Sequence, residues 1–297
     1  MEAAPAFALG EWSTRRLAQV EDALSHWVAE DAPAGLGEAM RYAVLDGGKR
    51  LRPLLVFAAC EAAGGNEEAA LRAACAVELI HAYSLVHDDM PCMDNDVLRR
   101  GKPTVHVRFG QAEALLAGDA LQALAFEILV PEGDAVPAAV QARLCRLLAK
   151  AAGYEGMAGG QAIDLASVGL ALTEEQLRAM HRMKTGALLQ GSVMMGAACA
   201  GGPDSPALLR YGAAMGLAFQ VVDDILDVIA DSATLGKTAG KDAAADKPTY
   251  VSLLGLERSR AYAQELLREA LEALDVSGLP ETRALRALAG MVVNRAH

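Results

Sequence analysis

An apolar run that ends in a cluster of acids constrains this 297-residue chain more than any other feature. Between residues 73 and 86, apolar side chains repeat at helical spacing on two faces, so the run predicts a largely buried helix. The next ten residues, 87–96, place four aspartates within nine positions. Pro91 disfavours helical conformation at the residue before it, so the chain bends there and can return Asp94 towards Asp88.

Carboxylates at the end of a buried helix repel one another and are costly to desolvate unless a cation neutralises them. Hard oxygen ligands favour Mg²⁺, which proteins bind through a few carboxylates together with substrate phosphates. Arg99 and Arg100 follow directly in the sequence. They would repel a bare metal ion but suit a metal ion that carries an anion. His87 and Cys92 leave a softer metal open, and a solvated acidic loop is the alternative interpretation.

A second apolar helix, predicted over residues 210–230, carries a second group of acids, Asp223, Asp224 and Asp227. Asp223 and Asp227 are four residues apart and share one helix face, where they would repel without a cation. The motif GGKRLRP at residues 47–53 predicts a helix N-terminus flanked by cations, which suits an anion. For that motif alone, an ordinary helix-ending turn with solvated charges is an equally good interpretation.

Two further features point to the same region. His81 lies two helical turns before Asp88 on the same face, where a phosphate contact competes with a packing role. Gly186 follows Lys184 and Thr185 within a long helix predicted over residues 172–201, and it indicates a break, close ligand approach or helix crowding.

Two other segments leave alternatives open. The pair Gln161 and Asp164 follows a glycine-rich stretch and is either a hydrogen-bonded brace or a support behind the site. The segment 231–248, rich in Gly, Ala, Lys and Asp, is either a lid that closes over an anion or an inert surface loop.

The whole composition favours a single all-α domain over residues 1–297. Hydrophobic residues make up 53% of the chain and aromatic residues only 4%, while strand and hairpin signals are scarce. The net charge of −11 argues against binding nucleic acid or anionic membranes. Further predicted helices cover residues 12–30, 35–45, 112–130, 136–152, 256–274 and 280–293.

Targeting signals and cysteines indicate a reduced, cytoplasmic environment. The five cysteines lack metal-ligand spacing, and four of them lie in apolar helical stretches. The first 17 residues show no secretory signal pattern. No stretch of about 20 residues is predicted to span a bilayer, so we expect no stable membrane insertion.

The motifs, taken in order, resemble those of the trans-isoprenyl diphosphate synthases, and within them the bacterial short-chain farnesyl diphosphate synthases (geranyltranstransferases). The resemblance rests on GGKRLRP at 47–53, the DDxxxxD motif at 88–94, RRG at 99–101, KT at 184–185 and FQVVDDILD at 219–227. It implies an isoprenoid synthase fold, a single-domain all-α barrel of helices around a deep cavity, and a homodimer. It also implies Mg²⁺-dependent, head-to-tail condensation of isopentenyl diphosphate with dimethylallyl and geranyl diphosphate.

The resemblance also implies a role for each motif residue. Three Mg²⁺ ions, for which Mn²⁺ could substitute, would be held by Asp88, Asp89, Asp94, Asp223, Asp224 and Asp227. The allylic diphosphate would contact Arg99, Lys184 and Lys237, with Lys247 close by. Isopentenyl diphosphate would contact Lys49, Arg52, His81 and Arg100. Thr185 and Gln220 would offer oxygens to the allylic cation, beside the catalytic Lys184.

Product length is predicted from Tyr83, which lies five residues before Asp88 and so about 7.5 Å down the helix. Ser84 beside it is small, and Tyr83 is the first bulky ring that a growing hydrocarbon tail would meet. An aromatic residue here resembles the C15-producing bacterial type, so we predict farnesyl diphosphate, with a C20 geranylgeranyl product as the alternative. A terpene cyclase needs no second diphosphate site, an inactive synthase subunit would have lost acids, and a structural helical protein explains neither cluster.

Overall fold

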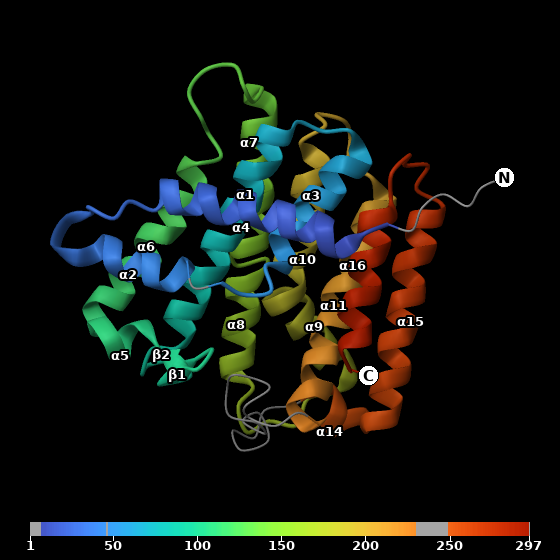
Figure 1. Ribbon diagram of the computed structural model, residues 1–297. Helices are drawn as coiled ribbons and strands as arrows, with labels where there is room; N and C mark the ends of the chain where they lie inside the picture. Colours follow the sequence, from blue (N-terminus) through green and yellow to red (C-terminus); the bar gives the residue numbers. More distant parts are fainter. Residues whose placement is uncertain (1–6, 46, 230–248, 297) are drawn as a thin grey trace.

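The computed structural model describes residues 7–45, 47–229 and 249–296. Lys237, Lys247 and the proposed lid at 231–248 lie outside the described residues. The described chain is almost entirely α-helical, as predicted, with one short antiparallel hairpin (Figure 1). In its first half the elements are α1 (Leu9–Trp27), the 3-10 turn η1 (Pro33–Gly35), α2 (Leu36–Val44), α3 (Leu51–Ala63), α4 (Glu67–Asp88), β1 (Leu98–Arg99), β2 (Lys102–Pro103), α5 (Val105–Phe109) and α6 (Gln111–Glu127).

The described residues of the second half form helices and helical turns. They are α7 (Ala138–Ala152), α8 (Met157–Ala166), α9 (Glu174–His181), the π-helical turn η2 (Arg182–Gly186), α10 (Ala187–Ala198), α11 (Pro206–Ile229), α14 (Tyr250–Leu254), α15 (Leu256–Asp275), α16 (Arg283–Val293) and the 3-10 turn η3 (Asn294–Ala296). The carboxyl ends of α4 and α11 lie at the same end of the molecule (Figure 1).

Helix α4 is the centre of the fold. It packs against α1, α2, α3, α6, α7 and α10, and Asn66 caps its N-terminus by accepting a hydrogen bond from the Ala69 N–H over 2.8 Å. By length and composition α4 could cross a membrane, which corrects the prediction that no stretch qualifies. Because 67% of that stretch is buried inside the protein, α4 is explained as a core helix.

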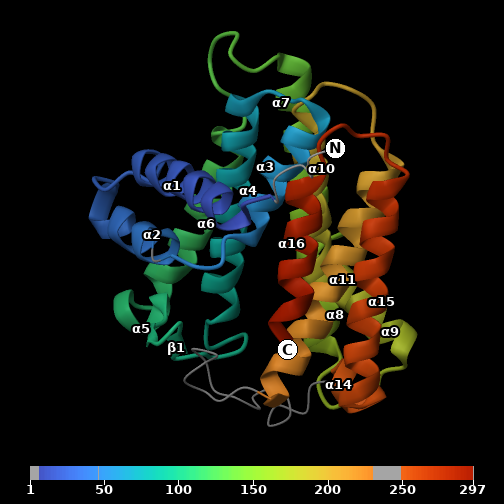
Figure 2. The ribbon, with the colours of Figure 1, turned by 45° about the vertical axis from the view of Figure 1, so that its right-hand side comes forward.

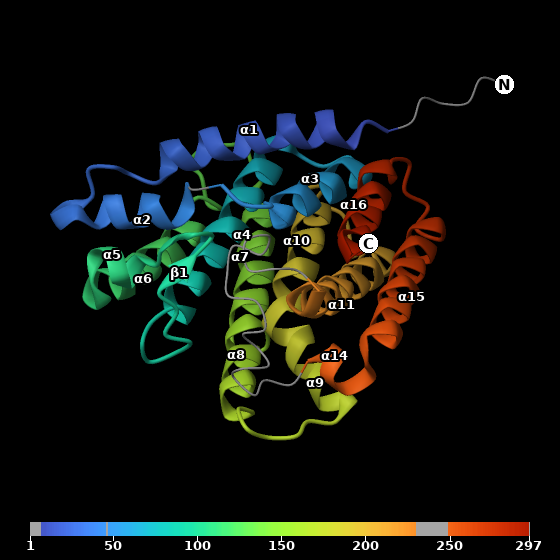
Figure 3. The same cartoon turned by 60° about the horizontal axis from the view of Figure 1, so that its bottom comes forward.

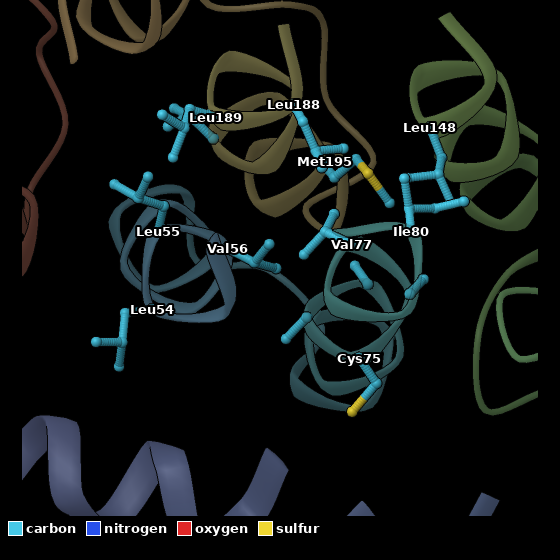
Figure 4. Close-up of a cluster of buried hydrophobic side chains, with 14 of the residues drawn as sticks. Leu54, Leu55, Val56, Cys75, Val77, Ile80, Leu148, Leu188, Leu189 and Met195 are labelled. Carbon is cyan, nitrogen blue, oxygen red and sulfur yellow. The ribbon is translucent and has the colours of Figure 1, made fainter. Parts of the chain in front are cut away.

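The largest core cluster fills the space between α3, α4, α7 and α10. Figure 4 shows Val56, Val77 and Met195 of these helices pointing towards one another. A second cluster lies between α11 and α15 and includes Val222 and Tyr250, both fully buried. Helices α11, α15 and α16 pack together on one side of the molecule (Figure 2). Helix α1 runs across α3 and α4 (Figure 3).

Helix α8 has no counterpart among the predicted helices. Its glycines have low helix propensity, which hid it in the sequence. One of them is required by close packing, because a Cβ at Gly160 would lie 2.1 Å from the backbone nitrogen of Lys184. The break indicated by Gly186 is the π-helical turn η2, which lies between α9 and α10 and packs against α8 and α11. Helix α8 is thereby held against the turn that carries Lys184 and Thr185.

Candidate active site

Two adjoining cavities open near the carboxyl ends of α4 and α11. We call the first the basic cavity: its volume is about 450 Å³, and its charged lining includes Lys49, Arg50, Arg52, Glu78, Arg99, Arg100, Asp223 and Arg295. The second, the deep cavity, measures about 390 Å³ and combines Asp88, Lys184 and Thr185 with apolar residues of α8. Arg52, His81 and Leu85 line both cavities, so the two adjoin at these residues.

Arg50 anchors the loop that leads into the basic cavity. Its φ of 44° is left-handed, and its guanidinium is buried and donates hydrogen bonds to Glu21, Glu78 and the Val44 carbonyl oxygen over 2.5–2.7 Å. These bonds hold an unfavourable backbone conformation in place. Arg50 is therefore a structural residue, and it fixes Lys49 and Arg52 on either side of it.

Gly48 provides the surface on which Arg100 rests. Its φ is +134°, and a Cβ there would lie 2.7–2.9 Å from the Arg100 guanidinium. The guanidinium also donates to the Gly47 carbonyl oxygen over 2.5 Å. Gly48 thus leaves the space that the Arg100 guanidinium fills, and Gly47, with a φ of +73°, supplies the carbonyl oxygen that this guanidinium binds.

Arg52 and His81 lie at the junction of the two cavities. Burial lowers the pKa of the Arg52 guanidinium, while Glu78 and Asp223 act in the opposite direction. Burial also lowers the pKa of His81 well below its ordinary value, and nearby arginines lower it further. His81 is consequently a neutral hydrogen-bonding group at neutral pH, and positive charge at the junction comes from Arg52.

The first acidic cluster bends back after Pro91 as predicted. The Asp94 N–H donates to the Asp88 carbonyl oxygen over 2.9 Å, and Asn95 has a φ of 51°. Burial raises the pKa of Asp88 to about 6, Lys184 opposes that rise, and the Asp94 carboxylate adds to it. The cluster is thus electrostatically unfavourable as it stands, which is the condition of a site that accepts a cation.

Asp89 faces away from this site. Its carboxylate, only 2% exposed, accepts bonds of 2.6–3.1 Å from the Arg99 guanidinium. This ion pair fastens the hairpin to the end of α4. Arg99 also lines the basic cavity beside Arg100 rather than the deep cavity.

The second acidic cluster has a similar division. Asp224, 3% exposed, accepts hydrogen bonds from the Gln220 amide over 2.8 Å and from the Tyr250 N–H over 2.7 Å. Asp223 lines the basic cavity, and its carboxylate lies 3.5 Å from the Arg295 guanidinium. Asp227 lies one turn further along α11 and is buried.

The π-helical turn presents Lys184 and Thr185 to the deep cavity. Lys184 donates to the buried Asp164 of α8 over 2.5 Å, and Thr185 donates its hydroxyl proton to the Gln220 amide oxygen over 2.8 Å. Because Gln220 in turn donates to Asp224, a chain of hydrogen bonds links the deep cavity to the second acidic cluster. Gln220 thus orients Thr185 from behind. Asp164 is therefore a hydrogen-bonded brace for Lys184.

Comparison with known proteins explains this combination of features. The profile of the polyprenyl synthetase family matches residues 33–281. The chain belongs to the polyprenyl synthetase family. It is 50% identical over 283 residues to the "Heterodimeric geranylgeranyl pyrophosphate synthase large subunit 1, chloroplastic" of Arabidopsis thaliana, covering 93% of this chain and 76% of the relative. It is 51% identical over 271 residues to a "Probable farnesyl diphosphate synthase" of Bradyrhizobium diazoefficiens, covering 89% and 81%.

A solved structure gives the same result for the fold. The geranyltransferase of Helicobacter pylori, solved with magnesium and isoprenyl diphosphate, superposes with a TM-score of 0.83 at 34% identity and covers 99% of both chains. This polyprenyl synthetase therefore has the all-α isoprenoid synthase fold, and its family is that of the trans-prenyltransferases.

The acidic clusters of this synthetase fit divalent metal ions that are shared with a ligand. Within residues 7–45, 47–229 and 249–296, no three His, Cys, Asp or Glu side chains converge on a ready-made metal cage. Mg²⁺ needs none, since one or two carboxylates and substrate phosphates commonly hold it. Asp88 and Asp94 on one side, and Asp223 and Asp227 on the other, are the residues that would hold it.

Three residues of the synthetase site were not assigned from the sequence. Arg295 reaches the basic cavity from η3, the 3-10 turn that follows α16. Asp164 was singled out without its partner. Tyr250 contributes through its backbone N–H, which no side-chain pattern reveals.

Proposed function

We propose that this prenyltransferase condenses isopentenyl diphosphate with dimethylallyl and then geranyl diphosphate to give farnesyl diphosphate and pyrophosphate. One observation carries the proposal: two acidic helix ends lie at a basic cavity that adjoins a deep, partly apolar one. The acids and cations fit two diphosphates, and the deep cavity fits a hydrocarbon tail.

In the proposed reaction the allylic diphosphate lies between the acidic clusters with its tail in the deep cavity. Mg²⁺, when bound by Asp88, Asp94 and Asp223, would supply charge stabilisation to the departing pyrophosphate. Lys184 contributes a fixed positive charge, because Asp164 holds its ammonium group in place over 2.5 Å. The C1–O bond breaks, and the pair of electrons leaves with pyrophosphate.

The allylic cation that remains is stabilised by the Thr185 hydroxyl oxygen. The Thr185 hydroxyl donates its hydrogen bond to the Gln220 amide oxygen, so the lone pairs of the hydroxyl oxygen point away from Gln220 and stay available. The protein thereby presents an oxygen acceptor without a negative charge that would trap the cation. The deep cavity also limits access of water to the cation.

Isopentenyl diphosphate is proposed to bind in the basic cavity through Lys49, Arg52 and Arg100, with neutral His81 as a further hydrogen-bonding partner. Its terminal double-bond carbon forms the new bond to C1 of the allylic cation. The carbon next to the resulting cation then loses a proton. The released pyrophosphate is the proposed acceptor, because Asp88 is the one carboxylate among the described residues that line the deep cavity, and Asp88 is assigned to the metal ions.

The C15 product is proposed from Tyr83. Its ring lines the deep cavity, where burial raises the pKa of the Tyr83 hydroxyl and the nearby Gln122 side chain of α6 opposes that rise. A C20 product is the second candidate, favoured by the name of the Arabidopsis relative. Product analysis by mass spectrometry after incubation with isopentenyl and dimethylallyl diphosphate and Mg²⁺ distinguishes the two.

The matched variant for this test is Tyr83→Ala. We expect it to deepen the cavity and to shift the product towards C20 or longer. An identical product distribution in wild type and variant would mean that Tyr83 does not set the length. Absence of any prenyl product from the wild type, with and without Mg²⁺, would contradict the proposed function itself.

The proposal includes a homodimer. Exposed apolar side chains on α5 and α6, among them Val107, Leu115 and Leu116, are 46–53% exposed in the single chain and would be covered in a dimer. Light scattering measures the mass in solution, and Leu116→Glu should lower it if this face is the interface.

A further inference from the structure

The His87 ring of α4 packs directly against Gly118 of α6, where any larger residue would collide with it. Its Nε2 lies 3.0 Å from the Leu115 carbonyl oxygen, and because a carbonyl only accepts, Nε2 carries the proton. A Cβ at Gly118 would lie 2.1 Å from that nitrogen and 2.5 Å from the ring Cδ2. The ring therefore fills the space that any side chain at position 118 would need.

Tyr83 completes this arrangement one turn earlier on α4. The two rings lie four residues apart on one helix face and meet edge to face, with centroids 5.5 Å apart at 88°. Both rings line the deep cavity, so they form one aromatic wall that contacts α6 at His87.

We propose that His87 is a second wall of the tail path, one turn nearer the diphosphates than Tyr83, and that Gly118 sets product length by keeping this ring out of the path. The inference rests on the proposed function, in which the deep cavity holds the tail. A ring displaced from Gly118 loses the Leu115 carbonyl, and the deep cavity that it already lines is the open space beside it. Such a displacement would shorten the path.

Gly118→Ala tests the inference directly. With isopentenyl and dimethylallyl diphosphate, we expect the ratio of C10 to C15 product to rise about tenfold, the scale of a group added to a hydrophobic pocket. His87→Ala removes the ring and should shift the product towards C20. This second variant keeps the inference testable if Gly118→Ala folds poorly.

The double variant His87→Ala/Gly118→Ala distinguishes a role of the His87 ring in setting product length from a general packing defect at Gly118. Without the ring, the added methyl group displaces nothing, so Gly118→Ala should not raise the C10 fraction in the His87→Ala background. Gly10→Ala on α1 is the control, because a Cβ there meets nothing within 4 Å, and it should leave the distribution unchanged.

Two results would overturn the inference. One is an unchanged product distribution in both Gly118→Ala and His87→Ala, whatever their turnover. The other is an equal rise in C10 from Gly118→Ala with and without His87. Absence of any prenyl product from the wild type would overturn the proposed function and this inference with it. The assay of the wild type alone distinguishes that outcome from the two results above.

Discussion

The two acidic clusters share one plan but are held by different chemistry. In each Asp-Asp pair the second residue is buried and bonded within the protein: Asp89 is 2% exposed and Asp224 is 3% exposed. The first residue of each pair, Asp88 or Asp223, lines a cavity instead. Each Asp-Asp pair therefore combines an anchor, meaning a buried aspartate bonded within the protein, with an aspartate that faces a cavity. Two identical neighbouring residues thus have different roles.

The anchors differ in what they bind. Asp89 is paired with the Arg99 guanidinium, whereas Asp224 accepts from neutral groups, an amide and a backbone N–H. Loss of charge at Asp89 would leave a partly buried cation without its counter-ion, while loss of charge at Asp224 would weaken ordinary hydrogen bonds. Four tests, from the largest expected effect to the smallest, examine this division.

The largest effect is expected from the cavity-facing acids. Asp88→Ala or Asp223→Ala should lower turnover at least ~10²-fold, the scale of losing one strong electrostatic stabiliser, because each removes a ligand for the metal ions on the diphosphate. Steady-state assays over a range of Mg²⁺ concentrations measure this. Melting temperatures serve as the control and should change little, since both acids line cavities and the contact of Asp223 with Arg295 is a long ion pair of 3.5 Å. Near-normal turnover in both variants would contradict the two-cluster mechanism.

The second test uses pH, because the neighbourhood of Asp224 contains a buried neutral histidine. His181 packs against Tyr250 with ring centroids 5.6 Å apart, and burial lowers its pKa to about 4. The unfolded chain binds a proton near the ordinary value, so stability from this group is present above about pH 6.5 and is lost as pH falls towards 4. The loss should reach about 3 kcal/mol in the free energy of unfolding.

His181→Phe is the matched variant, since it keeps a ring against Tyr250 but cannot titrate. Urea unfolding at several pH values should show that the decrease in unfolding free energy between pH 7 and pH 4 is smaller in the variant by about 3 kcal/mol. Parallel curves for wild type and variant would show that His181 is not a source of acid lability.

Part of the site could be predicted from the sequence and part could not. The cavity-facing acids, the basic loop and the bend after Pro91 follow from local patterns: apolar periodicity, charge clustering and proline geometry. They describe groups that are close in the sequence, and the structure brings them to one end of the molecule as expected. The metal and substrate roles of these residues stay predictions.

The anchoring contacts could not be predicted, because they join distant segments. Arg50 meets Glu78, Lys184 meets Asp164, and Tyr250 meets Asp224 only through the packing of several helices. Helix α8 was missed for a related reason: its glycines weaken the helix signal, and their packing benefit appears only when η2 lies against them.

The third test compares the anchors themselves. Asp89→Asn should lower the free energy of unfolding by about 2 kcal/mol, a value reduced from that of a fully buried pair because the Arg99 side chain is 34% exposed. Asp224→Asn keeps an acceptor oxygen and should cost about 1 kcal/mol. Urea unfolding at pH 7 measures both, and an equal cost for the two variants would remove the distinction between charged and neutral anchoring.

The smallest effect is expected at the edge of the second cluster, where Arg295 lies 3.5 Å from Asp223 and stacks on Phe219 at 5.6 Å. Arg295 lines the basic cavity but not the deep one, so it should contact only the diphosphate that binds there. Arg295→Gln should raise the KM for isopentenyl diphosphate severalfold, equivalent to about 1 kcal/mol, and leave the KM for geranyl diphosphate unchanged.

The matched control for Arg295→Gln is Arg286→Gln on α16, whose guanidinium pairs with Asp275 and does not line the basic cavity. It should change neither KM. A comparable rise in both KM values in Arg295→Gln would mean that Arg295 acts through Asp223 on the metal ions. A rise for isopentenyl diphosphate alone would show that the cavity-facing acid and its neighbouring cation serve different diphosphates, although only 3.5 Å separates them.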